Sequence, residues 1–165
     1  MNDNNRNDVI ALGKDGDCFL QRAGAAAVKI VNKAKSTSTA QIPQALEISF
    51  VHHGAGLLRT KAFFIASRAY QVSAVKERHG TAETSAGTLT AAVKKAASGT
   101  AVTSGTAVTS DTFNLKATAD TNLTGTLSAT ATDLQLAAGN ALGVVFSAAG
   151  TEIADIAITV TLIAI

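Results

Sequence analysis

Apolar and polar residues alternate along the chain from Pro43 onward. Leu46, Ile48, Phe50 and His52 occupy one set of alternate positions, and Glu47, Ser49, Val51 and His53 occupy the other. Because successive side chains of a β-strand point to opposite faces of the sheet, this period of two predicts a strand. We therefore expect a strand directly after the only proline of the chain.

Further short apolar runs follow, separated by Gly, Ser, Asn and Asp. They lie at residues 89–94, 113–116, 123–127, 134–136, 142–146 and 156–162, and residues 61–78 carry one long extended pattern. Several short strands at regular spacing, with turn residues between them, are typical of β-sandwiches and barrels. We predict an all-β domain over residues 43–165, an antiparallel β-sandwich that is jelly-roll-like.

The first part of the chain differs in kind and is predicted to be an N-terminal arm, residues 1–42. It begins polar, contains the short apolar group Val9–Leu12 and passes through several Gly and Ser residues. Residues 25–35 fit a short helix, and an extended segment fits equally because so short a helix is marginal by itself. The arm is therefore expected to be extended or partly helical.

The hexapeptide Ser-Gly-Thr-Ala-Val-Thr occurs twice in succession, at residues 98–103 and 104–109. Two copies cannot build a solenoid, which needs about three or more repeats. We expect a strand and loop region enlarged by local duplication, on a surface that tolerates changes in length.

Charge is distributed unevenly along the chain. Residues 1–80 hold 11 Lys and Arg against 6 Asp and Glu (net +5), and residues 81–165 hold 3 against 6 (net −3), which together give the +2 of the whole chain. A basic arm attracts nucleic acid, anionic membranes or acidic protein surfaces. The candidate partner-binding residues are the basic side chains of the arm: Arg6, Lys14, Arg22, Lys29, Lys33 and Lys35.

An acidic protein surface is the expected partner of the arm. Nucleic-acid-binding proteins usually add stacking aromatic residues or clustered Arg, whereas only 4% of this chain is aromatic. The most apolar stretch, residues 153–165, contains Asp155 and is shorter than the roughly 20 residues that a membrane helix requires. We expect neither nucleic acid nor a membrane as a partner.

Cysteine usage and the first residues indicate the compartment of synthesis. The single cysteine, Cys18, allows no disulfide within the chain, which suits a reducing compartment. Residues 1–8 are polar and include acids, whereas a signal peptide needs a basic start and an apolar run. We expect synthesis in the cytoplasm.

Candidate chemistry is sparse. Cys18 with His52, His53 or His79 would combine a thiol with a base, but no local motif supports such a pair. His52 and His53 would point to opposite faces of a strand, so they do not readily share a metal ion. We expect no catalytic residues, no metal site and no cofactor.

The acidic residues have simpler interpretations. Asp15-Gly16-Asp17 lacks the further oxygen ligands of a calcium loop, and Asp111, Asp120 and Asp133 stand beside turn residues, where Asp binds backbone amides. A glycan site would need exposed aromatic faces, and the chain has no Trp and only Tyr70. We therefore regard a glycan as a possible but less favoured partner.

Several segments resemble a known family. They are residues 62–79 (Ala-Phe-Phe-Ile-Ala-Ser-Arg-Ala-Tyr-Gln-Val-Ser-Ala-Val-Lys-Glu-Arg-His), 80–87 (Gly-Thr-Ala-Glu-Thr-Ser-Ala-Gly), 89–95, 113–121, 134–142 and 158–162. Over about residues 62–162 the chain resembles small tailed-bacteriophage virion proteins of the capsid decoration or cement type. It departs from their pattern at Asn140 and Ala141, where a charged residue is common after Ala-Gly.

The resemblance implies a β-sandwich that forms homotrimers on the outside of an icosahedral shell, with the major capsid protein as partner. It implies a virion protein of the capsid exterior, made in the host cytoplasm, and it supplies no catalytic residues. The basic arm, which lies outside the resemblance, is then expected to lie along or between capsid subunits. The alternative is another virion component, such as a head fibre, neck or tail-associated protein with a role in host-glycan binding.

Overall fold

The computed structural model describes residues 9–12, 18–22, 28–32, 35–41 and 45–165. The chain divides into two compact units, Met1–Gln44 and Ala45–Ile165. Among the described residues, no helix is long and apolar enough to span a membrane. Each unit is built from antiparallel strands.

The first unit contains one four-stranded sheet. Its strands are β1 (Val9–Leu12), β2 (Cys18–Arg22), β3 (Val28–Asn32) and β4 (Lys35–Gln41), which pair antiparallel in chain order. The helix that we considered for residues 25–35 is wrong for residues 28–32, which form β3, so the extended alternative holds there. The role of residues 1–42 as an arm that contacts a partner stays a prediction.

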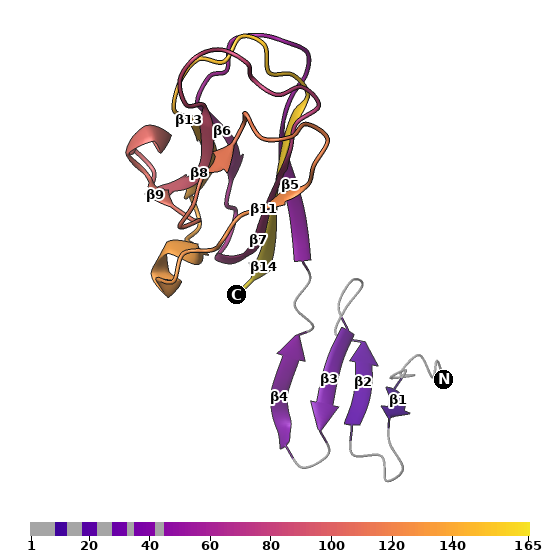
Figure 1. Cartoon of the computed structure of the whole chain (residues 1–165). Coiled ribbons are helices and arrows are strands. Elements are labelled where there is room, and N and C mark those ends of the chain that lie inside the picture. The colour runs from indigo at the N-terminus through magenta and orange to yellow at the C-terminus, as the bar shows by residue number, and fades with distance from the viewer. Residues whose placement is uncertain (1–8, 13–17, 23–27, 33–34, 42–44) are drawn as a thin grey trace, which may run out of the picture. The chain divides into compact units, whose positions relative to one another are not determined.

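The second unit is a sandwich of two antiparallel sheets (Figure 1). The first sheet contains β5 (Ala45–His52), β7 (Tyr70–Arg78), β11 (Leu123–Thr124), β12 (Gln135–Leu136) and β14 (Ile156–Ala164). The second contains β6 (Lys61–Ile65), β8 (Thr90–Ala96), β9 (Thr106–Ala107), β10 (Phe113–Asn114) and β13 (Ala141–Phe146). Two short 3₁₀ turns, η1 (Val102–Ser104) and η2 (Ala131–Leu134), lie in the connections.

The strand order is that of a jelly roll. It runs β11-β7-β14-β5 in the first sheet and β10-β8-β13-β6 in the second, with β12 beside β7 and β9 beside β8. Early strands of the unit pair with late ones: β5 with β14, β6 with β13, β7 with β11, and β8 with β10. The first half of the unit therefore runs antiparallel to the second half, as in a jelly roll. The predicted all-β, antiparallel, jelly-roll-like sandwich is confirmed.

The alternating apolar residues of β14 show how the sequence produces the core. Ile156, Ile158, Val160 and Leu162 are all 0% exposed, whereas the residues between them are half-buried. They pack against inward-facing residues of both sheets, among them Val72, Val75, Val93, Leu142 and Val144. At the β5–β6 side the core contains a cluster of phenylalanines, in which the rings of Phe50 and Phe63 lie 6.1 Å apart.

The prediction of one long extended segment over residues 61–78 is wrong. The chain forms β6 in one sheet, leaves the ladder at residues 66–69 and continues as β7 in the other sheet. At the break, Ala66 is buried and bonded to the loop before β13: its amide donates to the Asn140 carbonyl at 2.8 Å, and its carbonyl accepts from the Gly139 amide at 2.8 Å. An alternating pattern does not reveal which sheet each part of it joins.

The tandem hexapeptide adopts two different structures. In the first copy, Val102 lies in η1 and packs over Gly143, where a Cβ atom would come within 2.5 Å of the Val102 side chain. In the second copy, β9 pairs with β8, and Val108 is 0% exposed in the core. The expectation of a surface region tolerant of length is therefore wrong for the second copy, because Val108 is part of the core.

The same Val→Ala substitution should therefore change the stability of the protein by different amounts in the two copies of the hexapeptide. Val108→Ala should lower the free energy of unfolding by about 2 kcal/mol, since it removes two fully buried methyl groups and leaves a cavity. Val102→Ala should cost about half as much or less, because Val102 is only half-buried. Urea unfolding followed by Tyr70 fluorescence measures this unit alone, as Tyr70 is the only tyrosine and the chain has no tryptophan. Equal losses would contradict the assignment.

Candidate functional site

Four loops meet at one end of the sandwich, drawn uppermost in Figure 1. They connect β5 to β6 (residues 53–60), β7 to β8 (79–89), β10 to β11 (115–122) and β13 to β14 (147–155). We call this region the loop end. It holds the most deeply buried ionisable side chains that the structure describes, Glu77, His79 and Glu83.

Backbone hydrogen bonds tie the four loops to one another. The Leu58 amide donates to the Gly150 carbonyl at 3.4 Å, and the Glu83 amide donates to the Leu115 carbonyl at 3.0 Å. Thr81 and Ala154 form an isolated antiparallel bridge. Each loop is thereby bonded to at least one other loop of this end.

The carboxylate of Glu83 is the main side-chain link among these loops. It is 2% exposed, and its Oε2 accepts hydrogen bonds from the amides of Thr151 at 2.9 Å, Glu152 at 3.1 Å and Ile153 at 3.4 Å. Its Oε1 accepts from the Ser85 amide at 3.1 Å. Gly150 makes room for the carboxylate, because a Cβ at this position would lie 2.9 Å from Oε2 and 2.7 Å from the Leu89 side chain.

These donors determine the ionisation of Glu83. Hydrogen bonds from Ser85, together with those from the amides of Glu152 and Thr151, hold the pKa of Glu83 at about 2, against the opposing effect of burial. Glu83 is therefore an anion at neutral pH, and its charge is neutralised by backbone dipoles rather than by a cation.

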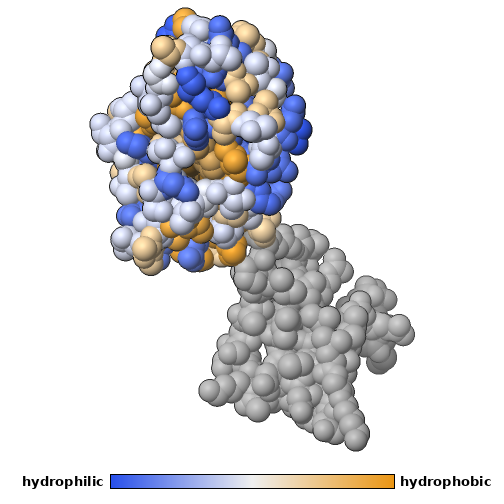
Figure 2. Space-filling model, in the orientation of Figure 1, coloured by the Kyte–Doolittle hydropathy of each residue, from blue (hydrophilic) through white to orange (hydrophobic). Residues whose placement is uncertain are grey.

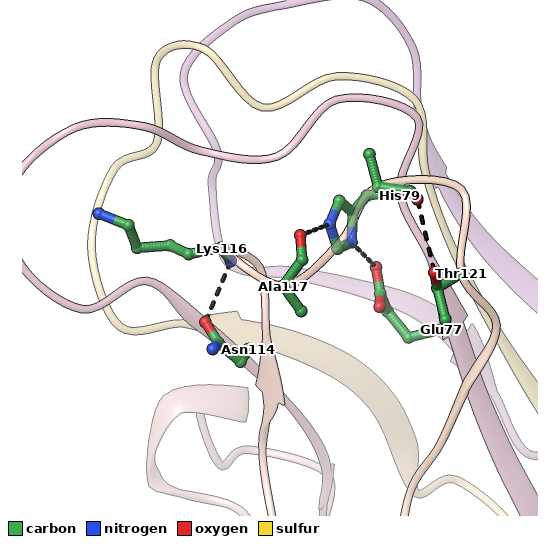
Figure 3. Close-up of polar contacts among 7 residues, drawn as sticks. Glu77, His79, Asn114, Lys116, Ala117 and Thr121 are labelled. Atoms are coloured by element: carbon green, nitrogen blue, oxygen red, sulfur yellow. Dashed lines mark hydrogen bonds and ion pairs between the residues drawn. The ribbon is translucent and has the colours of Figure 1, made fainter.

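Glu77 and His79 form a second buried unit (Figure 3). His79 is 0% exposed and Glu77 is 1% exposed. The imidazole bridges two acceptors: Nδ1 lies 3.0 Å from Oε1 of Glu77, and Nε2 lies 3.1 Å from the carbonyl oxygen of Ala117. It thus connects the end of β7 to the loop between β10 and β11, which the Asp120 amide also joins by donating to the His79 carbonyl at 2.8 Å.

The partners of the imidazole fix its protonation at one nitrogen. A carbonyl oxygen has no proton to give, so Nε2 carries a proton and donates it to Ala117. The contact between Nδ1 and Glu77 then needs one proton, carried by either group, and the pair is neutral overall in both arrangements. Burial raises the pKa of Glu77, with an opposing effect of the hydrogen bond to His79.

The environment of the second carboxyl oxygen of Glu77, Oε2, favours a protonated carboxyl group. Oε2 is buried and has no hydrogen-bond partner within the described part of the chain. An unpaired oxygen costs less on a neutral carboxylic acid than on a carboxylate. The pair is therefore closed to solvent and occupied in joining two loops, which leaves neither group free to meet a substrate.

Exposed side chains reinforce the same end. Nη2 of Arg78 lies 2.9 Å from Oδ1 of Asp120, the Gly54 amide donates to Oδ1 of Asp155 at 3.0 Å, and Nζ of Lys116 donates to the Gly87 carbonyl at 3.2 Å. Asp120 and Asp155 adopt left-handed backbone conformations with φ of 60° and 54°, which Asp tolerates better than most residues. The loop end is thus held by contacts at its surface as well as beneath it.

The predicted partner-binding residues belong to the first unit. Arg6, Lys14 and Lys33 lie outside the described residues. Arg22, Lys29 and Lys35 lie in β2, β3 and β4, where Lys29 stands opposite Gln21 and Gln41 in the register. The sheet brings these three strands side by side, and a common basic surface stays a prediction.

The other candidates are distributed over both units. Cys18 begins β2 in the first unit, whereas His52, His53 and His79 lie in the second. His53 is exposed and His52 is half-buried, and Asp15-Gly16-Asp17 lies outside the described residues. In the part of the chain that the structure describes, no three His, Cys, Asp or Glu side chains are placed to hold a metal ion.

Sequence reasoning missed both buried carboxyl groups. Glu77 and His79 were detectable, because the period of two that places Val75 in the core also places residues 77 and 79 on the inward face. Glu83 gave no such signal, since it lies in a loop and the three amides that bind its Oε2 are 68 to 70 residues away in the sequence.

Comparisons with known proteins give two structural likenesses. No protein-family model and no curated protein sequence matches the chain. A chain of the cyanophage Pam1 capsid asymmetric unit has a TM-score of 0.46 and 14% identity, covering 82% of this chain and 98% of that one. A structure of infectious bursal disease virus, Gx strain, has a TM-score of 0.33 and 15% identity, covering 91% of this chain and 38% of that one. Neither likeness assigns a function to this chain.

The Glu83 site predicts a loss of stability in acid. A group with a lowered pKa in the folded state stabilises the fold above its unfolded pKa, so this contribution is lost as the pH falls from 4.5 towards about 2. Glu83→Gln should lower the melting temperature by several degrees at pH 7 and flatten the acid limb of the stability curve. Glu152→Gln, at an exposed neighbouring position, is the control. The prediction fails if both variants lose stability in acid as the unsubstituted protein does.

The raised pKa of Glu77 predicts the opposite dependence of stability on pH. Its pKa is raised in the folded state, so the stability that it contributes is fully present below pH 4.5 and declines as the pH rises through the raised value. Glu77→Gln keeps an N–H that donates to Nδ1 of neutral His79, and it should flatten this decline. Thermal unfolding from pH 4 to 8 measures the effect, and parallel curves for the two proteins would contradict it.

Proposed function

We propose that this chain is a structural protein of a bacteriophage virion, a capsid decoration or cement protein that binds and stabilises the assembled head. The observation that carries the proposal is the tied loop end. Its buried ionisable groups, Glu77, His79 and Glu83, are all bonded to the loops or to each other. A site that uses its polar groups to fix its own loops is suited to a durable binding module rather than to catalysis.

The fold agrees with this assignment. Jelly rolls occur in viral capsid proteins, in lectins and in cupins, and the resemblance of residues 62–162 to decoration proteins favours the first class. The glycan-binding alternative receives no support from Tyr70, which is 5% exposed and whose ring packs edge-on against Phe64, with 5.9 Å between the ring centroids. We therefore favour the decoration protein over a glycan-binding fibre or tail component.

The mechanism of stabilisation is thermodynamic linkage. A protein that binds the assembled shell and not its separated subunits shifts the equilibrium towards the shell, and many copies multiply a modest gain per site. The partner is the major capsid protein, met at the capsid exterior. The homotrimer that the resemblance implies would add avidity, because three arms on one particle bind together.

The arm is assigned the contact with the shell, which a truncation tests. Full-length protein should sediment with assembled heads that lack it. A variant without residues 1–35 should lose attachment while residues 45–165 stay folded, as judged by Tyr70 fluorescence. Undiminished attachment of the truncated protein would overturn the role of the arm, and failure of the full-length protein to bind would overturn the proposed function.

A charge test separates the arm from general electrostatics. Lys29→Glu with Lys35→Glu should reduce attachment by tenfold or more at low salt, since an acidic surface would repel the altered arm. Lys61→Glu with Lys76→Glu makes the same change of charge at exposed positions of the sandwich and should have a small effect. Equal losses in the two double variants would contradict a specific role for the arm.

A further inference from the structure

The four edges of the sandwich differ in how they are protected. One edge of each sheet is broken into two-residue strands, β11 and β12 in the first sheet and β9 and β10 in the second. The β6 edge carries Lys61, and its pairing with β13 is interrupted by a bulge between Leu142 and Gly143. Short strands, lysines and bulges are the usual devices that keep sheet edges from pairing with other chains.

The β5 edge has no lysine and no bulge, and the acidic residue that it carries is Glu47. It is eight residues long, contains neither Lys nor Pro, and pairs with β14 in one unbroken register from His52 to Ala45. None of the described strands pairs with its other side. Leu46 and Val51 on this strand are 38% and 48% exposed, and Leu57 in the following loop is 53% exposed.

The visible face of this unit is largely polar. Figure 2 shows hydrophilic and near-neutral residues over most of the visible surface of this unit, with hydrophobic residues in scattered groups. Ile65 at the end of β6 and the terminal Ile165 are also exposed, at 70% and 62%. β5 differs from these positions in combining exposed apolar side chains with a long, regular edge, whose free amides and carbonyls form a template for one more strand.

The sequence of β5 indicates what kind of strand would pair with this edge, because its pattern of apolar and polar residues is symmetric about Ile48. In an antiparallel pair with a second copy, Ile48 opposite Ile48 places Leu46 opposite Phe50 and Ala45 opposite Val51. The same register places Glu47 opposite Ser49 on the other face. Every apolar residue then meets an apolar residue, and every polar residue meets a polar one.

Neighbouring registers lack this match. A shift that centres the pair on Glu47 places two carboxylates opposite each other, and a shift that centres it on Ser49 places Glu47 opposite Val51. Registers of odd offset pair the inward residues of one copy with the outward residues of the other. The symmetry of the strand thus selects one register and a two-fold axis through it.

We propose that β5 is the contact between two copies of this chain, paired antiparallel about Ile48. The contact would join the two β11-β7-β14-β5 sheets into one continuous sheet. It does not rest on the proposed virion function, and it is a two-fold contact, distinct from the trimer that the sequence resemblance implies.

Charge substitutions at Ser49 test the register. Ser49→Lys places a lysine opposite Glu47 of the other copy, twice per dimer, and Ser49→Glu places two carboxylates there instead. Ser49 is exposed, and both variants lose the same 2.8 Å hydrogen bond to Thr159, so their folds are equally affected. The dissociation constants of the two variants should differ by about tenfold at low salt, with Ser49→Lys the tighter, and less at high salt.

Sedimentation equilibrium of the full chain measures these constants. Glu47→Lys added to Ser49→Glu should restore the tight dimer, because it re-creates two opposite-charge pairs. Equal constants for the two single variants, or a trimer that neither changes, would overturn the proposal. A full chain that stays monomeric would overturn it as well, and would mean that residues 1–44 of the same chain or a different protein occupies this edge.

Discussion

The loop end of the sandwich depends on the carboxylate of Glu83, buried without a cation. A charge removed from water must be compensated, and backbone amides from residues 151–153 and 85 provide the compensation. This compensation constrains segments far apart in the sequence, because the loop before β14 must lie against the loop after β7 to supply those amides. The neutral Glu77–His79 pair extends the same constraint to the loop before β11.

Small residues and buried ionisable residues have different structural roles in this fold. Small polar and apolar residues build the ladders, and the few deeply buried ionisable groups that the structure describes are concentrated where four loops need fixed positions. This division explains how a sandwich with so few aromatic residues holds long loops in place. The ionisable groups of the loop end are bonded within the unit, whereas exposed apolar side chains lie on β5.

Much of the sandwich could be predicted from the sequence, for a physical reason. Strands such as β5 and β14 have one face in the core, so their period of two appears directly in the residues. The break at residues 66–69 was not visible, because the chain changes sheets there and alternation does not show which sheet a residue joins. The tandem hexapeptide marks the limit most clearly: Val102 and Val108 share one local sequence, yet only the second reaches the core.

For the buried ionisable groups, too, strand periodicity is visible in the sequence and contacts between distant segments are not. Glu77 and His79 could have been placed by strand periodicity, whereas Glu83 depends on contacts between distant loops. The basic positions at Arg22, Lys29 and Lys35 were identified from charge alone, and their strands lie side by side in the first unit.

The central claim is that this chain is a protein of the assembled head, and its copy number in purified virions tests that claim most directly. Quantitative mass spectrometry would compare this protein with the major capsid protein in the same particles. The account predicts a ratio near one, as expected for a protein that covers the whole shell. A few copies per particle, or none, would contradict it.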